Sequence, residues 1–216
     1  MSIRSPRIFA SSKRKPGKRE TQKTLQDEVG AQLVEFAVAL PLLVLFVVGI
    51  FDFSNAFTFK QKLTNIARDA ARIAAADPAG DVRTAATPPP ASVIDAFATV
   101  DGYLLANNIN DCAPALSSTV GLTWTYTGTS NGCPSGGLTI VINRGYYFIP
   151  GTSTQTANAT CTQVQAVGGT QTAIVSTCVS ISYAYQWRFG KVASILGSTM
   201  ALPMAVTVSS VAMNEN

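Results

Sequence analysis

The feature that most constrains this 216-residue chain is an apolar run from Leu33 to Phe51. As a helix, at about 1.5 Å per residue, the run would extend roughly 28 Å, which is close to the hydrocarbon thickness of a bilayer. Pro41 lies inside the run and is expected to bend the helix locally, which membrane helices tolerate. The run therefore predicts one membrane-spanning helix, with the rest of the chain arranged on either side of it.

A basic segment precedes the run. Residues 1–29 contain eight of the sixteen Lys and Arg residues and three of the twelve Asp and Glu residues. Such a segment can bind nucleic acid, or it can hold the N-terminus in the cytoplasm by the positive-inside rule. Its place directly before the apolar run favours the second role, so we expect no nucleic-acid partner. Its polar, proline-containing composition predicts a disordered leader.

An ordinary secretory signal peptide is an alternative, with Ser54-Asn55-Ala56 or Ala74-Ala75-Ala76 as its cleavage site. The length of the run, the carboxylate of Glu35 and the helical pattern that continues beyond the run argue against it. An ionisable side chain inside a membrane helix marks a functional site by default. If the chain were cut just before it, Glu35 could be neutralised by the new α-amino group. It could equally be a boundary glutamate solvated by lipid headgroups, and the residues alone leave both alternatives open.

Apolar residues continue at helical spacing after the run. They are Ala56, Phe59, Leu63, Ile66, Ala70 and Ile73. We expect this amphipathic stripe to pack on the chain's own globular domain, and the helix to end near Asp77-Pro78-Ala79-Gly80. A shorter second helix is predicted over residues 91–107, with Ser92 as its N-cap.

Beyond residue 107 the pattern becomes that of β-strands. Strands are predicted over residues 122–126, 138–148, 174–187 and 204–213, with a polar loop over 151–172 and a short turn or helix over 188–196. Helices followed by strands with hairpin-type connections indicate the α+β class. The predicted architecture is a long N-terminal transmembrane-plus-amphipathic helix packed on a small antiparallel sheet. The predicted divisions are a leader over 1–30, the helix over 31–76 and an exported domain over 77–216.

All four cysteines lie beyond the apolar run, at Cys112, Cys133, Cys161 and Cys178. An even number of cysteines in an exported domain predicts two disulfides, for which three connectivities exist. The pairing of cysteines close in sequence is favoured, which joins Cys112 to Cys133 and Cys161 to Cys178. Four buried free thiols are the alternative.

Residues suited to catalysis are missing from the sequence. The chain has no histidine, no cysteine pair with C-x-x-C spacing and no glycine-rich phosphate loop after a strand. We therefore expect no catalytic residue, no metal, no cofactor and no enzymatic activity. Caps and turns account for Asp95, Asp101 and Asp111. The aromatic residues Tyr183, Tyr185 and Trp187 are expected to serve in packing.

Gly30-Ala-Gln-Leu-Val-Glu35-Phe36 resembles the processing site of type IV prepilin-like proteins, in which a membrane prepilin peptidase cuts after the glycine. Three further stretches are similar to the TadE family of the tight adherence (Flp) pilus system. These are the run from Ala37 to Phe53, the segment Leu63–Arg72 and the C-terminal segment Val208–Glu215.

The resemblance implies a minor pilin or pseudopilin, cleaved between Gly30 and Ala31, that takes part in pilus assembly, adhesion or biofilm formation. By the same resemblance, Glu35 and Phe36 make assembly contacts, and the partners are the prepilin peptidase, other pilin subunits, the assembly machinery and the membrane. The chain would lie in the bacterial inner membrane with its N-terminus inside and its C-terminal domain periplasmic, extracellular or in the pilus. The alternative function is that of a single-pass, membrane-anchored adhesin or binding domain that is not processed.

Overall fold

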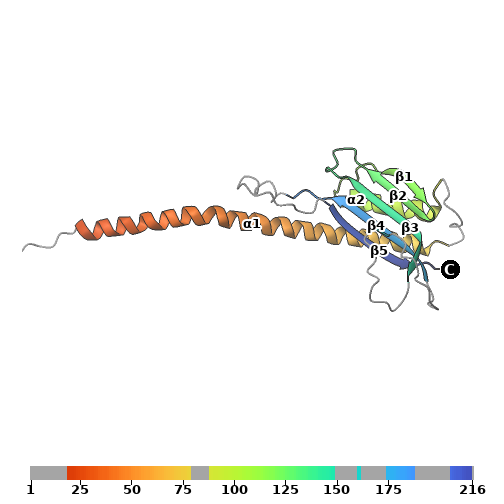
Figure 1. Cartoon of the computed structure of the whole chain (residues 1–216), viewed down its shortest axis with the longest axis horizontal. Helices are drawn as coiled ribbons and strands as arrows, with labels where there is room; N and C mark the ends of the chain where they lie inside the picture. The colour runs from red at the N-terminus through yellow and green to blue at the C-terminus, as the bar shows by residue number, and fades with distance from the viewer. Residues whose placement is uncertain (1–18, 79–87, 149–159, 162–173, 188–204, 216) are drawn as a thin grey trace, which may run out of the picture. The chain divides into compact units, whose positions relative to one another are not determined.

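The computed structural model describes residues 19–78, 88–148, 160–161, 174–187 and 205–215, with side chains from residue 30 onward (Figure 1). The chain divides into two compact units, Met1–Val47 and Val48–Asn216.

Helix α1 extends from Arg19 to Ala76 and contains Pro41. The prediction of a disordered leader through residue 29 is wrong for residues 19–29, which are helical. The physical reason is local, because no proline or glycine lies between Gly17 and Gly30 and most of the intervening residues are good helix formers. Residues 1–18 lie outside the described part of the chain. The helix ends where the sequence predicts, since Pro78 disfavours helical geometry at the residue before it.

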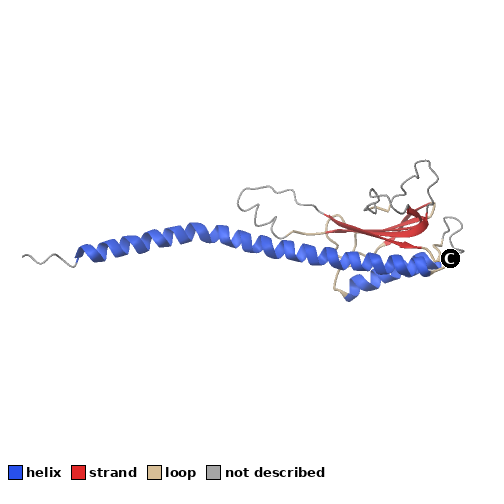
Figure 2. Cartoon of the chain, turned by 90° about the horizontal axis from the view of Figure 1, so that it is seen from below, coloured by secondary structure: helices blue, strands red, loops and turns tan. Residues whose placement is uncertain are grey.

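The second unit contains a five-stranded antiparallel sheet in which the strands follow one another in chain order (Figure 1). The strands are β1 (Ala115–Val120), β2 (Thr123–Gly128), β3 (Leu138–Phe148), β4 (Ile174–Ala184) and β5 (Ala205–Met213). Helix α2 (Ala91–Ala106) and the C-terminal part of α1 lie on the same face of this sheet (Figure 2). The α+β prediction, with a long apolar helix and a small antiparallel sheet, is therefore confirmed.

The core lies between the two helices and the sheet. Alternate residues of the strands point into it because side chains of a strand alternate between faces, and Trp124 and Ile140 are fully buried there. Helix α1 contributes Leu63 and Ile66 together with four alanines, Ala67, Ala70, Ala71 and Ala74. The predicted stripe is wrong at Ile73, which is 40% exposed. The buried face of α1 instead follows the alanines, whose small side chains let the helix approach its neighbours closely.

Some predictions for the second helix and the strands differ from the structure, beyond shifts of one or two residues at their ends. Ser92 is buried inside α2, and the N-cap position is held by Pro90, which makes no side-chain capping bond. The sequence pattern does not predict strand β1, because its Ser- and Thr-rich sequence is mostly exposed and lacks alternating large apolar residues. The fourth strand ends at Ala184 rather than at Trp187. The predicted loop over 151–172 lies outside the described residues except for Thr160 and Cys161, and the predicted turn over 188–196 lies entirely outside them.

Candidate functional site

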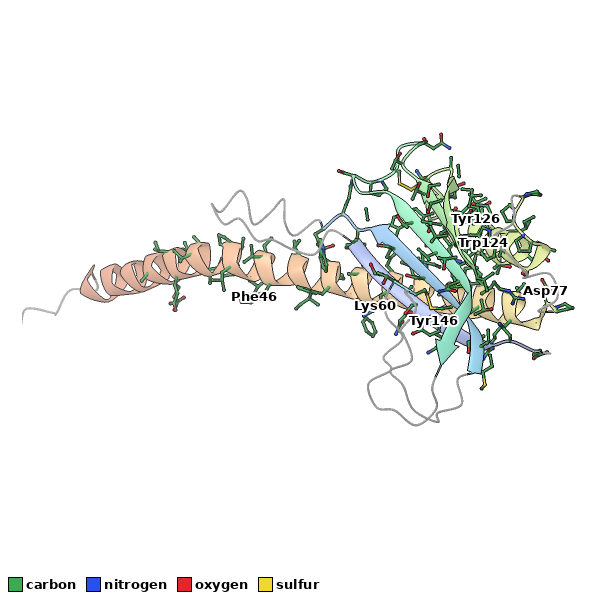
Figure 3. All side chains as sticks on the ribbon, turned by 45° about the vertical axis from the view of Figure 1, so that its right-hand side comes forward. Phe46, Lys60, Asp77, Trp124, Tyr126 and Tyr146 are labelled. Atoms are coloured by element: carbon green, nitrogen blue, oxygen red, sulfur yellow. A yellow bond between two sulfur atoms is a disulfide. The ribbon has the colours of Figure 1, made fainter. Side chains whose placement is uncertain are left out.

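The first part of α1 presents an apolar surface with no protein around it in this unit. Leu33, Val34 and Phe36 are between 63% and 65% exposed, and Phe46 is 62% exposed (Figure 3). By length and composition the helix could cross a membrane, since it contains an 18-residue window with a mean hydropathy of 2.7. Exposed apolar area is unfavourable in water by about 25 cal/mol per Å². A contiguous surface of this kind indicates contact with lipid or with another protein.

Gly30 lies inside α1, and the helix does not require a glycine there. A Cβ atom added at Gly30 would meet nothing within 4 Å. A glycine in a helix interior is less favourable than alanine by about 1 kcal/mol. The packing of the described chain therefore does not account for a glycine at this position.

Glu35 lies on a helical face made largely of small side chains. Ala31 and Ala39 are four residues before and after it, so the three share one face of α1. The shallow concavity on this face is lined by Gly30, Ala31, Val34, Glu35, Val38, Ala39 and Leu42. The exposed Phe36 does not line it. The structure thus brings Gly30, Ala31 and Glu35 to one accessible strip, while their roles in cleavage and assembly remain predictions.

Residues 30–72 match the TadE-like protein family. The match covers about a fifth of the chain, and this TadE-like segment contains the apolar run and most of the packed part of α1. It confirms the family resemblance and indicates a protein associated with a tight-adherence pilus. No curated protein and no solved structure matches the chain significantly.

Beyond the TadE-like segment, the domain carries two disulfides, Cys112–Cys133 and Cys161–Cys178. This is the sequence-local pairing, and the alternative of four free thiols is wrong. The first disulfide joins the connection between α2 and β1 to the loop between β2 and β3. The two backbones approach closely here, since a Cβ atom at Gly128 would lie 2.5 Å from the carbonyl oxygen of Cys112.

The second disulfide lies on the face of the sheet opposite the helices. Cys161 and Cys178 form a small buried cluster with Tyr146, which is labelled in Figure 3, and this cluster is separate from the main core. The side-chain amide of Asn143 donates a hydrogen bond to the carbonyl oxygen of Cys161 at 2.9 Å. The disulfide and this hydrogen bond together fix the chain at Cys161 against β3 and β4.

Arg144 is a buried residue that the sequence analysis did not identify. It is 1% exposed and lies at an irregularity in the pairing of β3 with β4. Its guanidinium donates hydrogen bonds to the carbonyl oxygens of Ala74 and Asp77, the latter at 3.2 Å. The last turn of α1 has no basic residue of its own, so a cation from the sheet stabilises the negative end of the helix dipole. A lone arginine within an apolar strand is the signal that could have identified it.

The C-terminus joins the same hydrogen-bond network. Asn214 accepts hydrogen bonds from Thr177 at 2.6 Å and from Arg144 at 3.5 Å, and it donates to the carbonyl oxygen of Arg144 at 3.2 Å. The backbone N–H of Glu215 donates to the carbonyl oxygen of Ala75 at 3.0 Å. The C-terminal end of α1 is thus held by residues from β3, β4 and the C-terminal tail.

The aspartates do not form a metal site in the described part of the chain, where no group of three suitable ligands occurs. Asp101 and Asp111 interact, and the pKa of Asp101 is raised by burial first and by the negative charge of Asp111 second. Burial, with a contribution from Asp111, also raises the pKa of Tyr183. Asp95 is exposed on α2.

The aromatic residues near the end of β4 pack on α1. Tyr183 is 5% exposed, contacts the ring of Phe59 at 5.3 Å and donates a hydrogen bond to the carbonyl oxygen of Asn110 at 2.9 Å. The prediction of a packing role is confirmed for this residue. Tyr185 and Trp187 are half-buried and extend this cluster, since Tyr185 packs on Phe59 and Trp187 packs on Tyr185.

Proposed function

We propose that this chain is a minor pilin or pseudopilin of a tight-adherence pilus. It is a non-enzymatic subunit, anchored in the inner membrane by α1, with a cytoplasmic N-terminus and its sheet domain outside. It serves in pilus assembly, adhesion or biofilm formation. The observation that carries the proposal is the TadE-like segment itself, which presents an exposed apolar helix with a glycine that its own packing does not require and, five residues on, the accessible carboxylate of Glu35.

Cleavage after Gly30 accounts for that glycine. The family match begins at this residue, and a Cβ here would meet no protein atom. A prepilin peptidase that accepts glycine but no larger side chain gives the position a chemical reason that packing does not supply. Cleavage also removes the eight basic residues of the leader and makes Ala31 the new N-terminus.

Glu35 then acquires a partner. Four residues of helix place it about 6 Å along the axis from Ala31, on the same face as the new α-amino group. A carboxylate in hydrocarbon must be paired, and the α-amino group of a neighbouring subunit is a suitable cation. The small side chains of Ala31 and Ala39 leave room for a second helix to approach this strip. Glu35 therefore serves to align subunits during assembly.

The substitution Glu35→Gln tests this function, because it keeps the shape of the side chain and removes its charge. We expect normal cleavage and membrane insertion, but a decrease of at least about tenfold in the amount recovered with sheared pili, as a lost ion pair in hydrocarbon exceeds about 1.4 kcal/mol. Asp69→Asn is the matched control, since Asp69 is an exposed acid in the same helix and the same family match. Normal incorporation of the Glu35→Gln chain would contradict the assembly role of Glu35, whereas absence of the wild-type chain from the sheared pili would favour an unprocessed membrane-anchored adhesin.

A further inference from the structure

A group of aromatic side chains gathers in the second unit, just after the apolar run ends. Phe53 and Phe57 lie on α1 and Trp187 follows β4. The rings of Phe53 and Trp187 are 5.3 Å apart, and those of Trp187 and Tyr185 are 5.0 Å apart, both edge to face. Two segments distant in sequence thus bring their aromatic rings into contact in the second unit.

The two phenylalanine rings are exposed although they belong to the folded domain. Phe53 is 58% exposed and Phe57 is 63% exposed, and they follow Ile50 and Phe51, each 67% exposed. A shallow groove runs between the helix and the sheet here, and its lining includes Phe53, Phe57, Lys60, Trp187 and Val206. In the second unit, the exposed apolar surface of α1 at Ile50 and Phe51 therefore continues into an aromatic groove.

The accessible charged residues of α1 near this groove are basic. Between Phe36 and Arg68 the helix holds one acidic residue, Asp52, and it is 3% exposed, with the hydroxyl of Tyr185 3.5 Å from its carboxylate. The basic residues Lys60, Lys62 and Arg68 follow the rings along the helix. Lys60 lines the groove itself. Aromatic rings followed by cations match the order of a bilayer surface, where acyl chains give way to anionic headgroups.

The spacing along the helix agrees with the dimensions of that surface. Phe53 and Phe57 lie about 6 Å apart along the axis, and Lys60 lies about 4.5 Å further. The headgroup region on one side of a bilayer is about 5–8 Å thick. If residues 33–51 fill the hydrocarbon, the backbone positions of Phe53, Phe57 and Lys60 lie about 3 Å, 9 Å and 13.5 Å beyond its edge. Because helical side chains point back toward the N-terminus, the ring of Phe57 reaches the headgroup layer and the ammonium group of Lys60 approaches its aqueous side.

We propose that Phe53, Phe57, Trp187 and Lys60 form an interfacial collar that lies in the outer headgroup layer of the membrane and binds anionic phospholipid. The collar rests on the proposed anchoring of α1 in the membrane. It fixes the depth of the helix and holds the base of the sheet domain against the lipid surface until the subunit is extracted for assembly.

The two tryptophans of the chain provide the test, since Trp187 belongs to the collar and Trp124 is fully buried in the core. The full chain is reconstituted into phosphatidylcholine–phosphatidylglycerol vesicles that carry bromine either near the headgroup or near the end of the acyl chain. We expect the wild-type emission to fall in the presence of shallow bromine more than deep bromine, and this loss to disappear in the Trp187→Phe variant. Equal emission of the wild-type chain with brominated and unbrominated lipid would overturn the proposal.

A further variant separates the collar from the anchoring on which it rests. Phe46→Trp in the Trp187→Phe chain places a reporter inside the apolar run, where deep bromine should quench it. If this introduced reporter is quenched while Trp187 of the wild-type chain is not, the helix is inserted but the collar is wrong, with a second copy or water against the groove. Absence of quenching at both positions would refute the anchoring and the collar together.

Discussion

At the scale of single residues, substitution of Gly30 tests the proposed cleavage without disturbing the fold. Replacement of Gly30 by alanine should leave helix and membrane insertion intact, because the added Cβ meets nothing within 4 Å and alanine favours the helix by about 1 kcal/mol. We expect the Gly30→Ala chain to stay unprocessed and to keep its leader. Immunoblots of membranes from cells that contain the peptidase would show the longer species.

Gly102 offers the matched control for that substitution. It also lies inside a helix, α2, and an added Cβ there also meets nothing within 4 Å. The Gly102→Ala chain should be processed like the wild type. If both variants were processed normally, the glycine at position 30 would have no role in cleavage.

Loss of Arg144 should lower stability, because its buried guanidinium donates hydrogen bonds to the end of α1. Its removal leaves the carbonyl oxygens of Ala74 and Asp77 without their buried donor, so Arg144→Met should lower the free energy of unfolding by about 3 kcal/mol. Denaturant unfolding in detergent, followed by circular dichroism, measures this change. Arg72→Met, on an exposed face of α1, should change the free energy of unfolding by less than about 0.5 kcal/mol. Equal effects of the two variants would contradict the capping role.

Asp101 predicts a pH dependence. Its pKa is raised above 3.8 in the folded chain. At pH values between 3.8 and this raised pKa, the folded state therefore keeps a proton that the unfolded state has released. Stability therefore falls as the pH rises from about 3.8 through the raised pKa, and the loss persists at neutral pH. Asp101→Asn should raise Tm at about pH 7 and have little effect below about pH 3. A variant that is less stable than the wild type at neutral pH would contradict this account.

At the scale of elements, the sequence predicts α1 beyond residue 30, α2 and four of the five strands, because each has a clear apolar period. The sequence does not predict features that lack such an apolar period. Strand β1 is a polar edge, and the buried face of α1 follows alanines rather than Ile73. The arginine cap on α1 depends on a contact between residues about seventy positions apart, which no local pattern contains.

The disulfides are elements that the sequence could predict, and their effect on stability is calculable. Each closes a loop of about twenty residues, since the cysteines are 21 and 17 positions apart. The loss of either should lower the free energy of unfolding by about 3 kcal/mol. The double variants Cys112→Ser/Cys133→Ser and Cys161→Ser/Cys178→Ser, compared with the wild type in denaturant, measure this. An unchanged unfolding midpoint in both would show that the bridges do not constrain the chain.

At the scale of the whole molecule, the two units differ in what they need to be stable. Residues 48–216 bury a core between two helices and a sheet, closed by two disulfides. The described residues of the first unit expose nearly every apolar side chain, so they need lipid or another subunit around them. This division suits a subunit that waits in a membrane and is later transferred into a fibre. Gly30 and Glu35 stand out in the sequence because they lie at the start of a long apolar helix, whereas the partners proposed for them belong to other molecules.

The central claim is that the leader is removed after Gly30, and the mass of the mature protein tests it most directly. The chain is extracted from membranes of cells with and without the prepilin peptidase, and its intact mass and N-terminal sequence are determined. We expect a chain of residues 31–216 that begins at Ala31 when the peptidase is present, and the longer chain when it is absent. A membrane-inserted protein that keeps residues 1–30 in the presence of the peptidase, or that begins near Ala56 or Ala76, would contradict it.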